Sequence, residues 1–307
     1  MKGLLLILFA LVIFNTNAQQ KQVCITIDDL PAVTNGIPGF EIQEEITMGI
    51  VSTLKAYNAK AIGYVNEGKL HKNGELDNRL VGLLEQWLKH EQELGNHTYS
   101  HPNYHNVSFK DFSRNIKNGE RIIKPLAAKY NSEVRYFRHP YLRIGRSQSH
   151  ADSLRQFLTA NGYTEAPVTI DNDDYLFAAA FTKAYRADDA DLMKKISKDY
   201  LAYMEEKLIF FEEISMYLYE RPIAQTLLIH ANLLNSRYLD ELLDIYQKHG
   251  YAFVSQAEVL EDPAYKQQVT HYGEYGISWI KRWALSDGKE YSIFKDDQEA
   301  PAYIRGN

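Results

Sequence analysis

The sequence has only one cysteine, Cys24, in 307 residues. A single thiol cannot form an internal disulfide, so the fold of this chain has to be stabilised by its hydrophobic core. Hydrophobic residues make up 45% of the chain, which is sufficient for a core of that kind. Cys24 lies inside the apolar run from Val23 to Ile27 and not at the end of the N-terminal apolar segment, which argues against a lipoprotein anchor.

The sequence also lacks a run of basic residues, and its formal net charge is -6. A mildly acidic chain without a basic cluster has no electrostatic footprint for nucleic acid or for an anionic membrane surface. Both classes of partner are therefore excluded from the expected function.

A third absence is that of a long apolar run. The N-terminal run from Leu4 to Phe14 is shorter than the stretch of about 20 residues that spans a bilayer. With Lys2 before it and polar residues up to Ala18 after it, this pattern predicts a signal peptide over residues 1–18. We expect an exported protein, periplasmic or secreted, with no stable membrane insertion after cleavage; an anchor that is never removed is the alternative.

Several apolar runs end directly in ionisable residues. Each run is typical of a buried strand, and strands whose reactive residues follow their last apolar position favour a barrel with one active-site face. The ionisable residues that follow the runs are Asp28 and Asp29, Arg138, Asp171 to Asp174, and His230.

His97 and His101 are spaced as metal ligands. Residues four apart lie on one face of a helical turn, so both imidazoles can point at one ion. One of the acidic neighbours Asp28 and Asp29 could supply an oxygen ligand and the other a base. Taken alone, His230 would be a core histidine and the acidic pair a cap or turn.

Predicted strands alternate with predicted helices along the chain, and this alternation indicates an α/β fold with parallel strands. We expect a distorted (β/α) barrel of about seven strands. The strands are expected at 23–27, 61–65, near 94, 134–137, 166–170, 226–229 and 251–254, and the helices at 41–59, 76–92, 109–130, 148–161 and 233–249.

Two segments fall outside this alternation. A helical insertion at 181–219 is either a lid over the site or an extra surface helix pair. Residues 263–307 form a C-terminal extension whose aromatic residues are expected to pack on the barrel.

These stretches resemble the polysaccharide deacetylases of carbohydrate esterase family 4, the NodB-homology proteins. The resemblance covers a domain at 22–262 and departs from the family at Leu30, where glycine is usual, and at Tyr175, where tryptophan is usual. The five matching motifs, in order, are Ile27-Asp28-Asp29, His97-Thr98-x-x-His101, Arg138-x-Pro140-Tyr141, Asp171-x-x-Asp174 and Leu228-x-His230.

The resemblance implies a metal site formed by Asp29, His97 and His101. Zinc suits these nitrogen and oxygen ligands, and another divalent transition metal is the alternative. Asp28 would then be the general base, kept ionised and oriented by Arg138.

The resemblance also implies roles for Tyr141, His230 and Asp171. The backbone N–H of Tyr141 would stabilise the oxyanion. His230 would protonate the leaving amine, with its pKa raised by the charge of Asp171. His105 and His139 receive no role.

We therefore expect a zinc hydrolase that removes N- or O-linked acetyl groups from a polysaccharide, acting on carbon–nitrogen but not peptide bonds. Two alternatives remain: a hydrolase of small cyclic amides or imides on the same scaffold, and a non-catalytic carbohydrate-binding protein. An intact set of base, acid and ligands argues against the second alternative. Chitin oligomers, peptidoglycan and acetylated xylan are all open as substrates.

Overall fold

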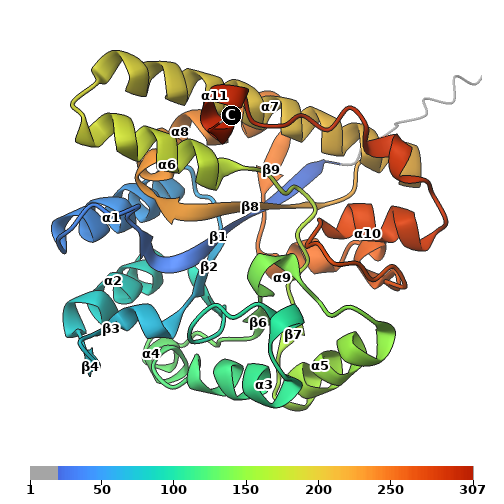
Figure 1. Cartoon of the computed structure of the whole chain (residues 1–307), viewed down its shortest axis with the longest axis horizontal. Helices are drawn as coiled ribbons and strands as arrows, with labels where there is room; N and C mark the ends of the chain where they lie inside the picture. The colour runs from blue at the N-terminus through green and yellow to red at the C-terminus, as the bar shows by residue number, and fades with distance from the viewer. Residues whose placement is uncertain (1–19, 307) are drawn as a thin grey trace, which may run out of the picture.

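The computed structural model describes residues 20–306, so the predicted signal peptide at 1–18 lies outside the described residues. A parallel sheet curls through the centre of the molecule as a half-barrel (Figure 1). Its strand order is β7-β6-β5-β2-β1-β8, with β9 paired to the start of β1. The predicted distorted (β/α) barrel is confirmed. The strands are β1 Lys21–Val33, β2 Ala61–Val65, β5 Glu93–Asn96, β6 Tyr136–Phe137, β7 Thr164–Glu165, β8 Gln225–Asn232 and β9 Tyr251–Phe253.

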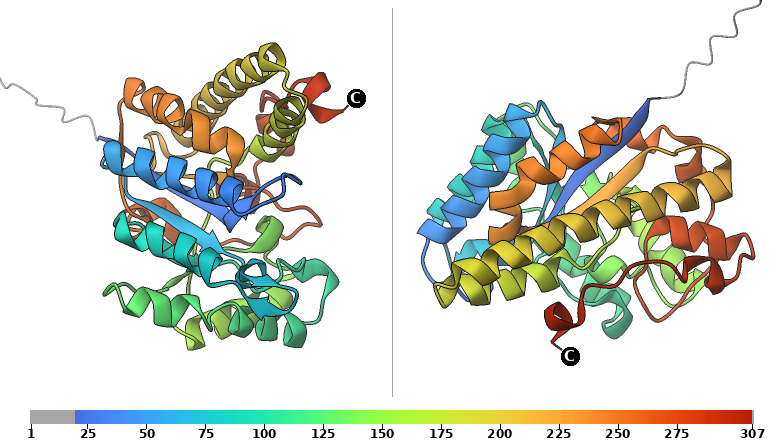
Figure 2. Two further views of the ribbon diagram at one scale, coloured as in Figure 1. Left: turned by 90° about the vertical axis from the view of Figure 1, so that its left-hand side faces the viewer. Right: turned by 90° about the horizontal axis from the view of Figure 1, so that it is seen from above.

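Helices surround this sheet (Figures 1 and 2). The helix expected at 109–130 is divided into α3 and α4, while the other barrel helices lie close to their expected positions. Within the described part of the chain, no helix is both long and apolar enough to cross a membrane. The helices around the sheet are α1 Glu41–Ala56, α2 Asn78–Lys89, α3 Phe109–Asn118, α4 Ile123–Ala128, α5 Gln148–Ala160 and α8 Leu233–Lys248. The strands β3 His71–Lys72 and β4 Glu75–Leu76 form a separate small hairpin.

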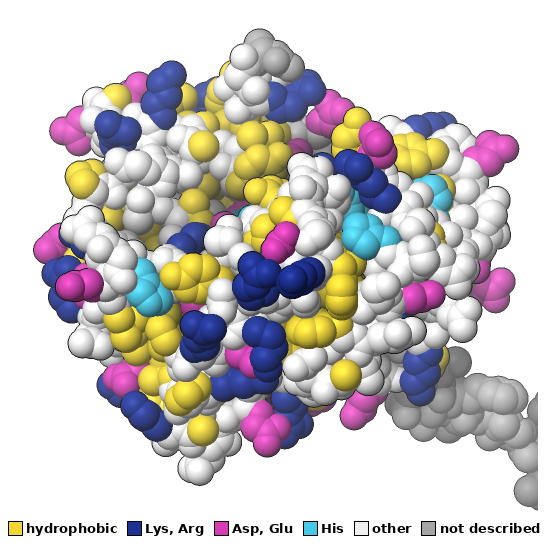
Figure 3. Space-filling model, turned by 60° about the horizontal axis from the view of Figure 1, so that its bottom comes forward, with side chains coloured by type: hydrophobic (Ala, Val, Ile, Leu, Met, Phe, Trp, Pro, Cys, Tyr) yellow, Lys and Arg dark blue, Asp and Glu magenta, His cyan; other side chains and the backbone are white. Residues whose placement is uncertain are grey.

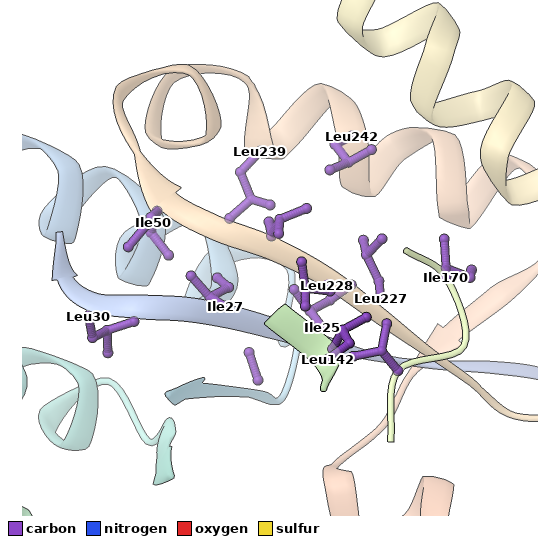
Figure 4. Close-up of a cluster of buried hydrophobic side chains, with 14 of the residues drawn as sticks. Ile25, Ile27, Leu30, Ile50, Leu142, Ile170, Leu227, Leu228, Leu239 and Leu242 are labelled. Carbon is purple, nitrogen blue, oxygen red and sulfur yellow. The ribbon is translucent and has the colours of Figure 1, made fainter. Parts of the chain in front are cut away.

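The core is centred on β1 and β8, which pair in register from Val23 with Gln225 to Asp28 with His230. Figure 4 shows Ile25, Ile27 and Leu228 among the buried side chains of this region. Leu30 belongs to the same core: it is fully buried, and a Cβ on Gly63 would lie 2.4 Å from its Cδ2. The residue that departs from the family pattern therefore fills the core.

The strand expected at 166–170 is wrong in its position. Only Thr164–Glu165 pairs with β6, and the chain then crosses to the opposite edge of the sheet. There the N–H of Ile170 donates to the carbonyl of Thr226 (3.0 Å), and the N–H of Leu228 donates to the carbonyl of Ile170 (3.1 Å). One short segment thus leads from the edge strand β7 to the other edge strand, β8, and bridges the open side of the half-barrel.

The insertion forms a pair of helices, α6 Asp174–Arg186 and α7 Ala190–Tyr219. The two lie side by side above the sheet, next to α8 (Figure 2). α7 buries Tyr200, Met204 and Phe211 in the main core, so it is an integral packing element.

The C-terminal extension contains α10 Trp279–Ser286 and α11 Ala302–Arg305, and it follows α9 Gln256–Leu260. The N–H of Trp279 donates to the carbonyl of Val168 (2.6 Å). Arg282 is almost fully buried and donates to the carbonyl of Leu142 (2.9 Å). These bonds attach the extension to the closing segment of the barrel and to the loop after β6.

The surface carries charges of both signs. On the face shown in Figure 3, Lys and Arg side chains are interspersed with Asp and Glu side chains. That face therefore has no broad region of one sign.

Candidate active site

A cavity of about 630 Å³ lies at the carboxyl ends of the strands. The predicted site residues that line the cavity are Asp28, Asp29, His97, His101, Tyr141, Asp171 and His230. The other predicted site residue, Arg138, is fully buried behind Asp28.

The acidic pair lies in a bulge of β1. The strand does not end at Ile27 as predicted but continues to Val33, and its register with both neighbours shifts at the pair. Asp29 has a φ of 72°, in the left-handed region. Neighbours on a regular strand face opposite sides, whereas this bulge turns both carboxylates toward one imidazole. Asp28 Oδ2 and Asp29 Oδ1 lie 3.7 Å and 3.8 Å from His97 Nε2.

The two histidines do not lie on a helix, so the predicted helical turn is wrong. They lie on a loop after β5, in which Thr98 and His101 have φ values of 70° and 54°. The side chain of Asn96 accepts the N–H of Thr98 (2.7 Å), and the hydroxyl of Thr98 accepts the N–H of His101 (3.0 Å). These bonds hold a tight turn that brings the two imidazole centroids to 4.7 Å.

Asp29, His97 and His101 fit a metal ion. Their ligand atoms lie within 4.8 Å of one another. The Nδ1–H of His97 donates to the carbonyl of Arg138 (2.8 Å), which leaves Nε2 with its lone pair toward the carboxylates. Asp29 Oδ1 is buried and, among the described residues, has no hydrogen-bond partner. A buried carboxylate oxygen beside two imidazole nitrogens is a donor set that zinc takes.

The electrostatics leave these ligands in their metal-binding forms. Burial raises the pKa of Asp29, but the charges of Lys69 and His97 outweigh it and hold this pKa well below its usual range. Burial lowers the pKa of His97 to about 3 and, with the charge of His97, lowers that of His101 to about 4. Near neutral pH the site therefore offers an ionised carboxylate and two neutral imidazoles.

Asp28 is held from behind by Arg138, as predicted from the motif. Arg138 Nη1 lies 3.3 Å from Asp28 Oδ1, while its Nε donates to the carbonyl of Ala166 and its Nη2 to the hydroxyl of Thr26 (3.0 Å each). Burial raises the pKa of Asp28, and the charges of Arg138 and His230 only partly oppose this effect. Arg138 therefore orients Asp28, and the pKa of that carboxyl stays above its ordinary value.

The carboxylate that contacts His230 is Asp174, so the prediction that Asp171 has this role is wrong. Asp174 is fully buried at the start of α6 and accepts the Nδ1–H of His230 (2.7 Å). Burial lowers the pKa of His230, but the charge and hydrogen bond of Asp174 outweigh it and raise this pKa to about 9. Asp171 lines the cavity without such a contact.

Three exposed tyrosines line the same cavity. The ring of Tyr141 meets that of His101 edge-on at a centroid distance of 4.5 Å, and the ring of Tyr175 meets that of His230 at 6.3 Å. Tyr275, in the C-terminal extension, was not predicted from the sequence, because no periodic pattern surrounds it. Of the helix pair, α6 lines the cavity through Tyr175 and Ala178, whereas none of the described lining residues lies within 181–219.

The two histidines without a predicted role both have structural partners. His139 lines the cavity and bonds through Nε2 to Glu165 Oε1 (2.8 Å). His105 accepts the N–H of Gly145 at Nε2 (3.1 Å) and donates from Nδ1 to the carbonyl of Glu274 (3.3 Å).

Comparison with known proteins identifies relatives of one kind. Residues 15–166 match the family model of polysaccharide deacetylases. A peptidoglycan-N-acetylglucosamine deacetylase of Bacillus cereus is 27% identical over 135 residues, which cover 44% of this chain and 42% of that protein. The match thus spans less than half the length of this curated relative.

Solved structures show the same fold. A peptidoglycan N-acetylglucosamine deacetylase superposes with a TM-score of 0.53 at 17% identity, over 78% of this chain and 88% of that one. A mutant of a carbohydrate esterase family 4 pseudoenzyme of Bacillus anthracis superposes with a TM-score of 0.50 at 19% identity, over 79% of this chain and 68% of that one. At these identities the likeness establishes the fold alone.

Proposed function

The chain belongs to the polysaccharide deacetylases of carbohydrate esterase family 4, and from this premise we propose that it is a metal-dependent hydrolase removing acetyl groups from a polysaccharide. One observation carries the proposal. A candidate metal site of Asp29, His97 and His101 lies between a buried acid–arginine pair and a histidine–carboxylate pair, all at one cavity. Such a site combines a base, an acid and a place for a metal.

A zinc ion, or another divalent transition ion, would supply Lewis acidity and an activated water when bound by these three residues. Asp28 accepts the proton of the attacking water. Its carboxylate is oriented by Arg138, whose charge opposes the rise in pKa that burial causes. Attack on the acetamide carbon then develops negative charge on the carbonyl oxygen, and the backbone N–H of Tyr141 is the donor we assign to it.

His230 completes the reaction as the general acid. Its Nδ1 is engaged by Asp174, so its Nε2 is the nitrogen available to protonate the leaving amine. A histidine with a pKa of about 9 is protonated near neutral pH, which is the form that an acid requires. The carbon–nitrogen bond then breaks to give acetate and a free amine; an O-linked acetyl group would leave an alcohol by the same steps.

We propose an acetylated polysaccharide or oligosaccharide as the substrate and an exported location for the chain. The pattern of residues 1–18 supports export. The substrate class is supported by the relative of Bacillus cereus, which is a peptidoglycan-N-acetylglucosamine deacetylase, and by the exposed tyrosines around the cavity. A small cyclic amide would leave these rim tyrosines without a partner.

The test is acetate release from chitin oligomers, peptidoglycan and acetylated xylan by protein reconstituted with zinc. We expect release from at least one polymer, and loss of most of it in Asp28→Asn, which changes one oxygen to an NH2 group without removing a predicted metal ligand. Absence of acetate release from all three polymers, with metal bound, would reject the proposed activity. Hydrolysis of a cyclic imide by the same preparation would then support the small-molecule alternative.

A further inference from the structure

The C-terminal extension contributes directly to the catalytic cavity through Tyr275 and Gly276. Tyr275 is 74% exposed, the highest value among the three tyrosines that line the cavity. No step of the proposed reaction uses it. Its position therefore needs a separate explanation.

The backbone on both sides of Tyr275 is fixed. A Cβ on Gly276 would lie 1.7 Å from the carbonyl oxygen of Tyr141, so only glycine allows the extension to lie against this loop. On the other side, the carbonyl of Glu274 accepts the Nδ1–H of His105, which also binds Gly145. Tyr275 is thus presented on a fixed backbone while its ring faces solvent.

The other two rim tyrosines lie nearer to the reacting groups. Tyr141 is 56% exposed and packs on His101, and Tyr175 is 51% exposed and packs on His230. These two rings flank the metal side and the acid side of the site. Tyr275 comes from a distant part of the sequence and lines the same cavity, and among the described aromatic contacts its ring meets neither histidine.

The polar groups of the cavity favour a ligand that can form hydrogen bonds. Asp28, Asp29, Asp171 and Asp173 line it together with the cationic side chains of Arg143 and His230, so the lining carries charges of both signs. Carboxylates accept hydrogen bonds from hydroxyl groups, and tyrosine faces pack against apolar C–H surfaces. A neutral ring with hydroxyl groups at its edge and C–H bonds on its faces satisfies both requirements.

We propose that Tyr275 forms an outer subsite, where it stacks on a sugar ring next to the one that loses its acetyl group. This inference rests on the proposed function, because it assumes a glycan substrate. It makes the C-terminal extension a determinant of specificity. Oligosaccharides that reach Tyr275 bind more tightly than a single sugar.

The test is a binding titration by calorimetry on the full chain with metal bound, in the Asp28→Asn background, with acetate monitored in the same samples. The ligands are N-acetylglucosamine oligomers and acetylated xylose oligomers of one to five units. Tyr275→Ala and Tyr275→Phe are compared with Tyr291→Ala, a matched control. Tyr291 is in the same extension, is 62% exposed and is not among the cavity residues.

We expect Tyr275→Ala to weaken binding of the longer oligomers about fivefold to tenfold and to leave the single sugar unaffected. Tyr275→Phe keeps the aromatic face and should retain wild-type affinity, as should Tyr291→Ala. Thermal melting of each variant verifies that the fold is intact.

Three results would overturn the inference. The parent and Tyr275→Ala could bind oligomers of every length with equal affinity, Tyr275→Ala could weaken binding of the single sugar as much as that of the longer oligomers, or no oligomer could bind. Acetate release by the wild-type protein decides the proposed function separately. Length-dependent binding through Tyr275 without acetate release would reject the activity and keep the subsite. Acetate release by the wild-type protein, with no effect of Tyr275→Ala on binding, would support the activity and reject the subsite.

Discussion

His230 and Asp174, 56 positions apart in the sequence, are joined by two hydrogen bonds. The imidazole Nδ1–H of His230 donates to Oδ1 of Asp174 (2.7 Å), and the backbone N–H of His230 donates to Oδ2 (2.9 Å). Asn232 and Asn235 donate to the same Oδ2. The carboxylate is therefore fixed and ionised, and it holds the histidine in one orientation.

This pair gives the first prediction, which concerns pH. In the proposed reaction His230 acts in its protonated form, and its pKa is raised to about 9, so acetate release should fall as the pH rises through that value. Asp174→Asn removes the charge that opposes burial, and the pKa of His230 should then fall. We expect the alkaline limb of kcat, measured from about pH 6 to 10 to cover both the ordinary histidine pKa and the raised value, to move to lower pH. Asp171→Asn is the control. A shift of the alkaline limb in Asp171→Asn but not in Asp174→Asn would show that Asp171 is the carboxylate that raises the pKa of His230.

The second prediction separates the two acidic neighbours. Asp28→Asn should retain the metal and lose turnover by about 10² to 10⁴-fold, the usual contribution of a general base. Asp29→Asn should lose metal, because a neutral amide oxygen is a poorer ligand for zinc. Metal content and acetate release are measured on the same preparations. Metal lost from Asp28→Asn and kept in Asp29→Asn would mean that the two roles are reversed.

The third prediction concerns the metal site as a whole. The wild-type chain should bind one divalent ion, and the His97→Ala/His101→Ala variant should bind none, since two of three protein ligands are gone. Elemental analysis after dialysis measures both. His249→Ala is a control, because His249 pairs with Glu205 away from the cavity. A full equivalent of metal in the double variant would refute the assignment.

The fourth prediction concerns the contact between the extension and the loop after β6. Gly276→Ala should destabilise the protein by about 1–3 kcal/mol through overpacking against Tyr141, and it should reduce turnover by displacing that loop. Gly82→Ala, in α2 with open space at its Cβ, should stabilise by about 0.5–1 kcal/mol. Urea unfolding provides both values. Equal stability of the two variants would show that the close approach at Gly276 is easily relieved.

Much of the site could be predicted because its residues follow apolar runs in a fixed order. The spacing of His97 and His101 indicated a metal site without knowledge of the turn that joins them, whereas the preference for Asp29 over Asp28 as the third ligand came from the family resemblance. That turn was predicted as helical because a spacing of four suits a helix. The left-handed conformations of Thr98 and His101 depend on hydrogen bonds that their backbone N–H groups donate to the side chains of Asn96 and Thr98, which the spacing does not reveal.

Other features depend on contacts between distant segments. The sequence does not indicate whether Asp171 or Asp174 contacts His230, because both follow the same apolar run. The contact depends on where α6 begins relative to β8. The run from Ala166 to Ile170 has the composition of a strand but serves to close the barrel, because only the fold brings Ile170 beside Leu227. Tyr275 enters the site for the same reason.

The bonds of the C-terminal extension also bear on when the protein can become active. The cavity takes side chains from Asp28, near the beginning of the described chain, and from Tyr275, close to its end. Domains generally fold as units, and the core that holds this cavity contains residues from both ends of the described chain. The lining of the cavity can therefore be complete only after nearly all of the described polypeptide has been made.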